Sequence, residues 1–150
     1  MVVRVYETVY QDFIDKIVDI FEAEKTYLGV KFVGGIDHDT ISSYPSIIVN
    51  LSTADEEYVS MPSIKCLTMT ADIIYWHMDA NKEVRGQEIR EAAGRINALL
   101  REKYDLEGFC DYASGDKIGS LIVRTEFFGK LRGLVGDALI KFEGYRKLRL

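Results

Sequence analysis

The sequence predicts an α+β fold, in which two helices pack on a mainly antiparallel sheet of about five strands. The expected order is helix, three strands, helix, two strands. Residues 64–79 (IKCLTMTADIIYWHMD) alternate like a strand and lead almost directly into residues 82–104, whose apolar positions recur at helical spacing. Residues 7–25 show the same helical spacing. Because the 150 residues contain no internal repeat or linker, we expect one domain spanning residues 1–150.

The predicted strand at residues 64–79 has two different faces. One face is apolar throughout, as a helix-covered sheet face should be, and consists of Leu67, Met69, Ala71, Ile73 and Tyr75. The other face begins with small or polar residues, namely Cys66, Thr68, Thr70 and Asp72. It ends with the large apolar residues Ile74, Trp76 and Met78. This half of the second face is expected to be buried, and a partner subunit is a candidate to bury it.

The remaining elements follow from local patterns. The first helix has the apolar stripe Val9, Phe13, Ile17, Ile20 and Phe21. Strands are predicted at residues 29–33 and 44–51, and the acidic segment 52–63 (STADEEYVSMPS) is expected to be an extended loop between two strands. The second helix has Asn81 or Asp79 as its N-cap and the stripe Ile89, Ala92, Ala93, Ile96, Leu99 and Leu100. A loop at 105–119 then precedes strands at 121–128 and 138–149, joined by GKLRGLVG.

Charge is distributed unevenly along the chain. Residues 1–116 carry 11 Lys and Arg against 21 Asp and Glu, whereas residues 117–150 carry 8 against 3. The basic end either folds onto its own acidic body or contacts the acidic side of the next copy, with Arg146, Lys147 and Arg149 as the basic contact residues. The acidic body would repel phosphate, so we expect no sequence-specific nucleic acid partner. No stretch approaches the roughly 20 apolar residues of a membrane span, and a membrane partner is not expected.

Catalytic and metal-binding motifs are weak in this sequence. The cluster Asp37, His38 and Asp39 is better explained as a polar turn, because three adjacent residues in an extended loop cannot all face one ion. His77 and Asp79 share a strand face and could form an acid/base pair, but Asp79 is better explained as a helix cap. The sequence therefore predicts no enzyme activity, no catalytic residues, no metal site and no cofactor.

Four segments together resemble the tail terminator proteins of long-tailed bacteriophages, also called minor tail or tail completion proteins. They are the helix pattern ETVYQDFIDKIVDIF, the strand YPSIIVNLS, the strand TMTADIIYWHMD feeding the helix KEVRGQEIREAAGRINALLREKY, and the closing pair LIVRTEFF and ALIKFEGYRKL. These segments cover nearly the whole chain. None of them is specific alone, because the family has no invariant catalytic motif.

The resemblance implies a structural virion protein. Such proteins form hexameric rings that cap the major tail tube protein, stop tail polymerisation and present a surface to the head connector or completion protein. DNA would only pass through the lumen, and the protein would be located in the virion tail after assembly in the host cytoplasm. Two other interpretations remain open. One is a small α+β ligand-binding or regulatory domain, with a pocket between the sheet face and the 105–119 loop. The other is a different neck component that joins head and tail.

Overall fold

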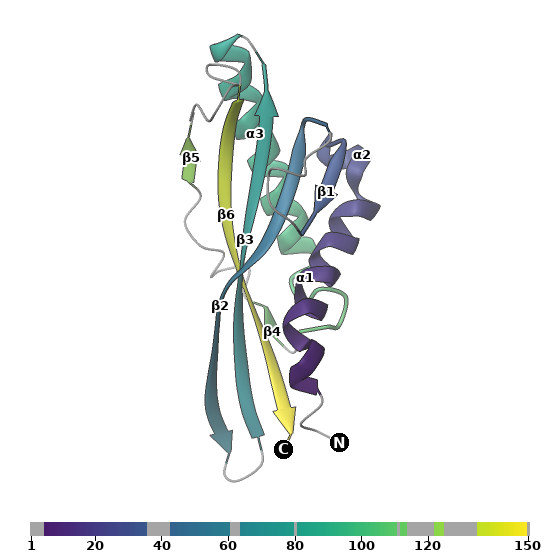
Figure 1. Cartoon of the computed structure of the whole chain (residues 1–150), viewed down its shortest axis with the longest axis vertical. Coiled ribbons are helices and arrows are strands. Elements are labelled where there is room, and N and C mark those ends of the chain that lie inside the picture. The colour runs from purple at the N-terminus through teal and green to yellow at the C-terminus, as the bar shows by residue number, and fades with distance from the viewer. Residues whose placement is uncertain are drawn as a thin grey trace.

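A computed structural model describes residues 5–35, 43–60, 64–79, 81–110, 112–113, 122–124 and 135–149. Within these residues the chain forms three helices and six strands (Figure 1). In chain order they are α1 (Val5–Ala23), α2 (Lys25–Leu28), β1 (Phe32–Gly34), β2 (Ser46–Ser60), β3 (Ile64–Met78), α3 (Lys82–Glu102), β4 (Tyr112–Ala113), β5 (Ile122–Arg124) and β6 (Val135–Arg149).

One mixed sheet contains all six described strands, in the order β1-β2-β3-β6-β4, with β5 also paired to β6. Its centre is a ribbon of β2, β3 and β6, each 15 residues long and antiparallel to its neighbour. At about 3.3 Å per residue such strands span roughly 50 Å. Figure 1 shows this ribbon twisting along its length, with the end of β2, the start of β3 and the end of β6 at the same end of the molecule.

The α+β class and the predominantly antiparallel sheet are confirmed, whereas the details of the order differ. β1 pairs with β2 in parallel, which the sequence did not indicate. The extra elements are short, because α2 has four residues and β4 has two. The predicted strand 29–33 begins three residues late because Gly29 adopts a left-handed conformation (φ 70°) and caps α2.

The expected loop at residues 52–63 is wrong over most of its length. β2 continues to Ser60 and pairs with β3 along the whole hairpin, with irregularities in register between Leu51 and Thr53 and between Tyr58 and Ser60. Local composition suggested a loop because the segment is acidic and polar. Pairing with the 15-residue β3 outweighs that local tendency, because each further residue of β2 that pairs gains backbone hydrogen bonds to a strand already in place.

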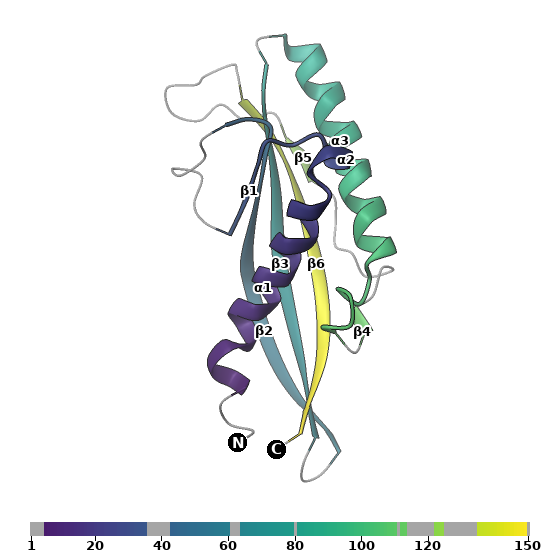
Figure 2. The same ribbon diagram turned by 90° about the vertical axis from the view of Figure 1, so that its right-hand side faces the viewer.

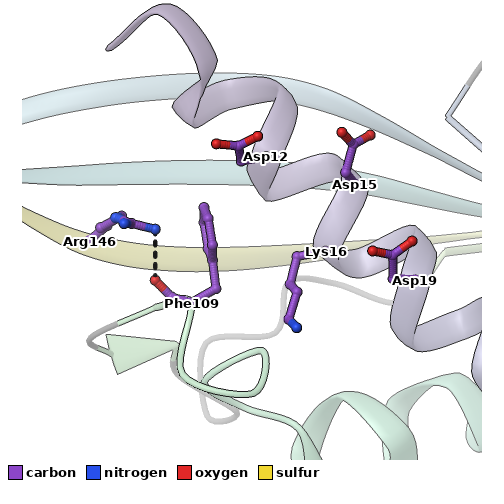
Figure 3. A pocket seen from close by; sticks show the side chains of 6 residues that line it. All are labelled: Asp12, Asp15, Lys16, Asp19, Phe109 and Arg146. Atoms are coloured by element: carbon purple, nitrogen blue, oxygen red, sulfur yellow. Dashed lines mark hydrogen bonds between the residues drawn. The ribbon is translucent and has the colours of Figure 1, made fainter. Parts of the chain in front are cut away.

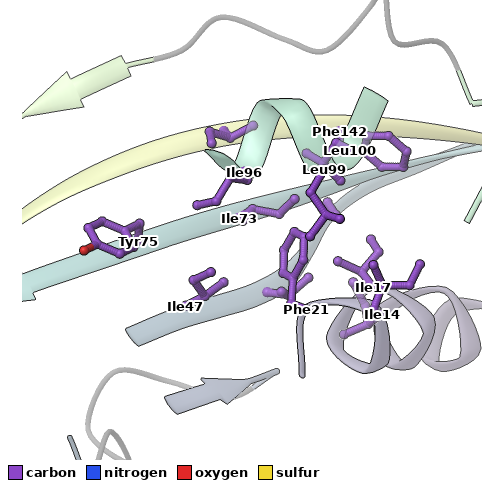
Figure 4. Close-up of a cluster of buried hydrophobic side chains, with 14 of the residues drawn as sticks. Ile14, Ile17, Phe21, Ile47, Ile73, Tyr75, Ile96, Leu99, Leu100 and Phe142 are labelled. Carbon is purple, nitrogen blue, oxygen red and sulfur yellow. The ribbon is translucent and has the colours of Figure 1, made fainter. Parts of the chain in front are cut away.

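The hydrophobic core lies on a single face of the sheet (Figures 2 and 4). α1 and α3 both pack there, and their predicted stripes are buried as expected. The strands contribute alternate residues in matching register, namely Ile47 and Val49 of β2, Leu67, Met69, Ala71, Ile73 and Tyr75 of β3, and Ala138, Ile140 and Phe142 of β6. The apolar face predicted for residues 64–79 is therefore confirmed as the core face.

Close packing of α1 on β6 depends on Gly144. A Cβ atom placed at this position would lie 2.6 Å from Cε1 of Phe13 and 2.8 Å from Sγ of Cys110. Both distances are shorter than real Cβ contacts, so the absence of a side chain lets α1 and the segment after α3 meet the sheet. No helix in the described ranges is long and apolar enough to cross a membrane.

Several predicted features fall outside the described residues. They are the turn Asp37, His38 and Asp39, the outer parts of the predicted strand 121–128 and most of GKLRGLVG.

Candidate subunit-contact surface

The sheet face opposite α1 and α3 carries the alternate residues of the three long strands, and we call it the open face. The described helices pack only on the other side. Near the start of β2, the open face is apolar, with Ile48, Ile74 and Leu139 in one cross-strand row. Ile48 is buried (2% exposed), whereas Ile74 and Leu139 are only partly buried. The adjacent row is formed by Ser46, Trp76 and Asp137, of which Ser46 and Asp137 are buried and Trp76 is partly buried.

The three predicted contact residues Ile74, Trp76 and Met78 lie on this face, two positions apart on β3. Ile74 and Trp76 are only partly buried, and Met78 is 39% exposed. By contrast, Ile73 and Tyr75, which face the helices, are at most 1% exposed. Successive strand residues therefore separate into core positions and positions that a further surface could cover, as the alternation in the sequence predicted.

The other half of the open face is polar. Lys141 Nζ lies 3.7 Å from Asp72 Oδ1, across the β3–β6 pair. Further along β6, the Tyr145 hydroxyl donates a hydrogen bond to Glu143 Oε2 at 2.9 Å. Both contacts lie within the chain, although Asp72 Oδ1 accepts no hydrogen bond from the described residues. The apolar half is consequently the part of this face better suited to contact with another protein.

The basic residues predicted as contacts lie elsewhere. In the strand register, Arg146 lies opposite Leu67 and Lys147 lies opposite Cys66, near the start of β3. Seven positions separate Leu67 from Ile74, which corresponds to about 23 Å along a strand. Arg149 lies further still, opposite Ile64. The structure therefore does not bring the basic and apolar groups together, and any assembly that uses both must use two separate surfaces.

Arg146 is also engaged within its own chain. Its guanidinium lies 4.4 Å from the centroid of the Phe109 ring, and its Nη1 donates a hydrogen bond to the Phe109 carbonyl oxygen at 3.2 Å. Arg146 thus holds the segment after α3 against β6. Of the two interpretations of the basic end, this contact supports the one in which the end folds onto its own domain, at the position of Arg146.

A buried polar cluster beneath α3 was missed by the sequence analysis. Arg85 is 1% exposed and its Nη1 donates a hydrogen bond to the Asp79 carbonyl oxygen at 2.9 Å. Nearby, the Tyr75 hydroxyl lies 3.1 Å from Nδ1 of His77. The helical spacing in the sequence indicated that Arg85 is on the buried side, because it is four residues before Ile89 and therefore belongs to the buried stripe of α3.

The same cluster shifts two acid–base equilibria. Burial raises the pKa of Tyr75 to about 12, with Arg95 opposing this and Glu88 adding to it. Burial also lowers the pKa of His77, against the opposite influence of Glu88 and Asp79. Asp79 instead accepts a hydrogen bond from the backbone of Asn81, so the suggested acid/base pair of His77 and Asp79 does not form a direct contact.

Asn81 is the N-cap of α3, as one of the two predicted alternatives. Its side-chain oxygen accepts hydrogen bonds from the backbone N–H groups of Glu83 at 3.0 Å and Val84 at 3.2 Å. The helix therefore begins directly after β3, and the end of β3 that carries Trp76 and Met78 is fixed relative to α3.

A pocket of about 370 Å³ lies on the helix side, between α1 and the segment after α3 (Figure 3). Its lining consists of Asp12, Asp15, Lys16, Asp19, Phe109 and Arg146. Figure 3 shows Lys16 extending from α1 towards the segment that carries Phe109. The pocket combines three carboxylates and two cations with one aromatic ring. Among the described residues, no group of three His, Cys, Asp or Glu side chains is arranged to hold a metal ion.

The fold and this geometry define a class only coarsely, as an α+β protein with helices on one face of a mixed sheet. No protein-family model matches the sequence, and a search of curated proteins found no significant match.

Proposed function

We propose that this chain is a structural virion protein that caps the phage tail tube as a ring. In this role it stops tail polymerisation and provides the surface to which the head connector docks. The observation that carries the proposal is the open face, where Ile74, Trp76 and Met78 remain partly exposed beside a fully formed core. A protein that works alone gains little from large apolar residues at such positions, whereas a subunit buries them on assembly.

The shape of the sheet supports the same proposal. Three 15-residue strands extend as a twisted ribbon, and six consecutive residues of β2, from Leu51 to Glu56, are exposed. Long ribbons of this kind offer several faces and edges for contacts with neighbours. In a ring each subunit contacts two neighbours through different surfaces, which agrees with the separation of the apolar patch from the basic residues.

Capping can be tested directly with the purified chain and tail tubes assembled from a major tail tube protein. If the proposal holds, electron microscopy will show a ring at one end of each tube, and tubes grown with the protein present will be shorter. The variant Trp76→Ala should cap less well at the same protein concentration. A chain that remains monomeric and neither caps the tubes nor limits their length would disprove the proposal.

The second candidate function is a ligand-binding or regulatory domain, and the pocket favours it. Phe109 belongs to the predicted 105–119 loop, and Arg146 belongs to the sheet, so the pocket borders two of the expected elements. A small molecule with both charges could use the carboxylates of α1 together with Arg146. A ligand retained through purification, or a large thermal shift with a metabolite that Asp15→Asn abolishes, would support this function over capping.

A further inference from the structure

The two outer edges of the β2–β3–β6 ribbon carry opposite charges at the same position along the ribbon. On β2, the acidic residues are Asp55, Glu56 and Glu57. Across β3, the register places Glu56 and Arg146 opposite Leu67, and it places Glu57 and Lys147 opposite Cys66. One side of the ribbon is therefore an acidic edge and the other a basic edge.

Neither edge is paired there in the part of the chain that the structure describes. β1 pairs with β2 only from Ser46 to Ile48, so the rest of β2 has no described strand on its outer side. β4 pairs with β6 only at Gly144 and Tyr145, so residues 146–149 are similarly open. On β2, the six consecutive residues 51–56 are exposed, whereas a strand inside a sheet would bury alternate residues.

The directions of the strands are compatible with pairing between copies. β2 and β6 are both antiparallel to β3, so they run in the same direction. If two copies stand side by side in the same orientation, the β2 edge of one meets the β6 edge of the next as a parallel pair. Because the acidic residues of β2 and the basic residues of β6 lie opposite the same residues of β3, acidic residues of one copy then face basic residues of the next.

We propose that the edge of β2 at residues 56–58 pairs with the edge of β6 at residues 146–148 of a second copy of this chain. The contact is head-to-tail, since each copy uses a different edge towards each neighbour, and repetition with a constant rotation closes a ring. Open strand edges pair readily with other chains, and opposite charges select this partner and disfavour pairing of two like edges. The inference rests on the proposed ring for its biological role.

Cross-linking of mixed copies tests the pairing. Equal amounts of unlabelled and ¹⁵N-labelled full-length chain are mixed and treated with a carbodiimide, which joins a carboxylate to an amine in contact. The expected product links Glu56 or Glu57 to Lys147 and contains one labelled and one unlabelled peptide in about half of the linked pairs, as random mixing requires. If this linkage contains only peptides of the same label, it arises within a chain, and the proposal is overturned.

Charge reversal gives an independent test. Lys147→Glu or Glu57→Lys should each weaken self-association at least about tenfold, as measured by sedimentation, because like charges then face each other. The double variant should recover most of the loss. Glu102→Lys, a reversal at an exposed position near the end of α3, is the control and should leave association unchanged. Thermal unfolding of each variant checks that it is folded. If folded single variants associate like the wild type, or if the wild type is monomeric at every concentration, the proposal is overturned.

These outcomes separate this inference from the proposed function. Rings that cap tail tubes but give no mixed-label linkage would overturn the edge pairing and leave the capping function intact. Rings that give the linkage but do not bind tubes would overturn capping and leave the edge pairing intact.

Discussion

The guanidinium of Arg146 stacks on Phe109 at 4.4 Å and also donates a hydrogen bond to the carbonyl oxygen of that same residue at 3.2 Å. Both interactions join the last strand to the segment that follows α3. A residue that the sequence suggested as a contact between subunits thus stabilises the fold of a single subunit.

Arg146→Ala should therefore lower the free energy of unfolding, by about 1–2 kcal/mol, through loss of the cation–π contact and the hydrogen bond. Urea unfolding measures this change. Lys16→Ala is the matched control, because it also removes one cation, but its ion pair with Glu107 is long (3.7 Å) and its two side chains are 34% and 49% exposed. We expect it to cost less than about 0.5 kcal/mol. If Arg146→Ala abolished assembly with unchanged stability, the contact with Phe109 would be unimportant and Arg146 would be an interface residue.

Trp76→Ala should weaken assembly more than it weakens the fold, because Trp76 is partly exposed on the open face. We expect at least about tenfold weaker ring formation, a typical effect for an aromatic residue at the centre of an interface. Ile73→Ala, three positions away on the core face, should instead cost about 2–5 kcal/mol of stability through a cavity. Sedimentation and urea unfolding measure the two effects. Equal loss of assembly and stability in Trp76→Ala would place this residue in the core.

Gly144→Ala should destabilise the protein by about 1–3 kcal/mol, because the added methyl group would overlap Phe13 and Cys110. Gly94→Ala makes the same chemical change on the exposed side of α3, where nothing lies within 4 Å of the new atom. There it should stabilise the helix by about 0.5–1 kcal/mol. Thermal unfolding of both variants tests the opposite signs, and stabilisation by both would show that α1 does not pack closely on β6.

The stability of the protein should fall in mild acid because of His77. Its pKa is lowered in the folded state by burial, so the unfolded chain takes up a proton first as the pH falls below its ordinary value of 6.5. The contribution of the neutral His77 to the free energy of unfolding is fully present above about pH 6.5. It decreases as the pH falls towards the pKa of His77 in the folded protein, with a slope of up to about 1.4 kcal/mol per pH unit. The charges of Glu88 and Asp79 raise the pKa of His77 in the folded protein and that of Arg85 lowers it. Together with burial they set the lower end of the pH range over which stability changes.

Urea unfolding between pH 5 and 7.5 checks this effect, with His77→Gln as the comparison. The variant keeps the second histidine, His38, so the difference between the two proteins isolates His77. A parallel pH dependence in both would contradict the assignment.

Periodicity predicted the elements whose burial is decided locally. Alternation identified the core face of β3, and helical spacing identified the stripes of α1 and α3, because both patterns follow from backbone geometry. The cap at Asn81 was also among the predicted alternatives. Arg85 shows the limit of this approach, since its spacing places it on the apolar stripe of α3, but only the structure shows how its charge is accommodated there, through a hydrogen bond to the Asp79 carbonyl oxygen.

The candidate contact surface was predictable only in part. The alternation at Ile74, Trp76 and Met78 placed these residues on one face, and the structure agrees. Their distance from Arg146, and the contact of Arg146 with Phe109, could not be predicted, because residues 109 and 146 are far apart in the chain.

By itself the sequence determined the α+β class, the face of β3 that enters the core and the unequal distribution of charge along the chain. Only the tertiary structure decided that residues 52–60 continue β2, and that the acidic and basic segments form opposite edges of one ribbon. The physical reason is that strand pairing joins distant segments through backbone hydrogen bonds. Their register is set by matching the apolar positions of two strands against each other, so it cannot be read from either segment alone.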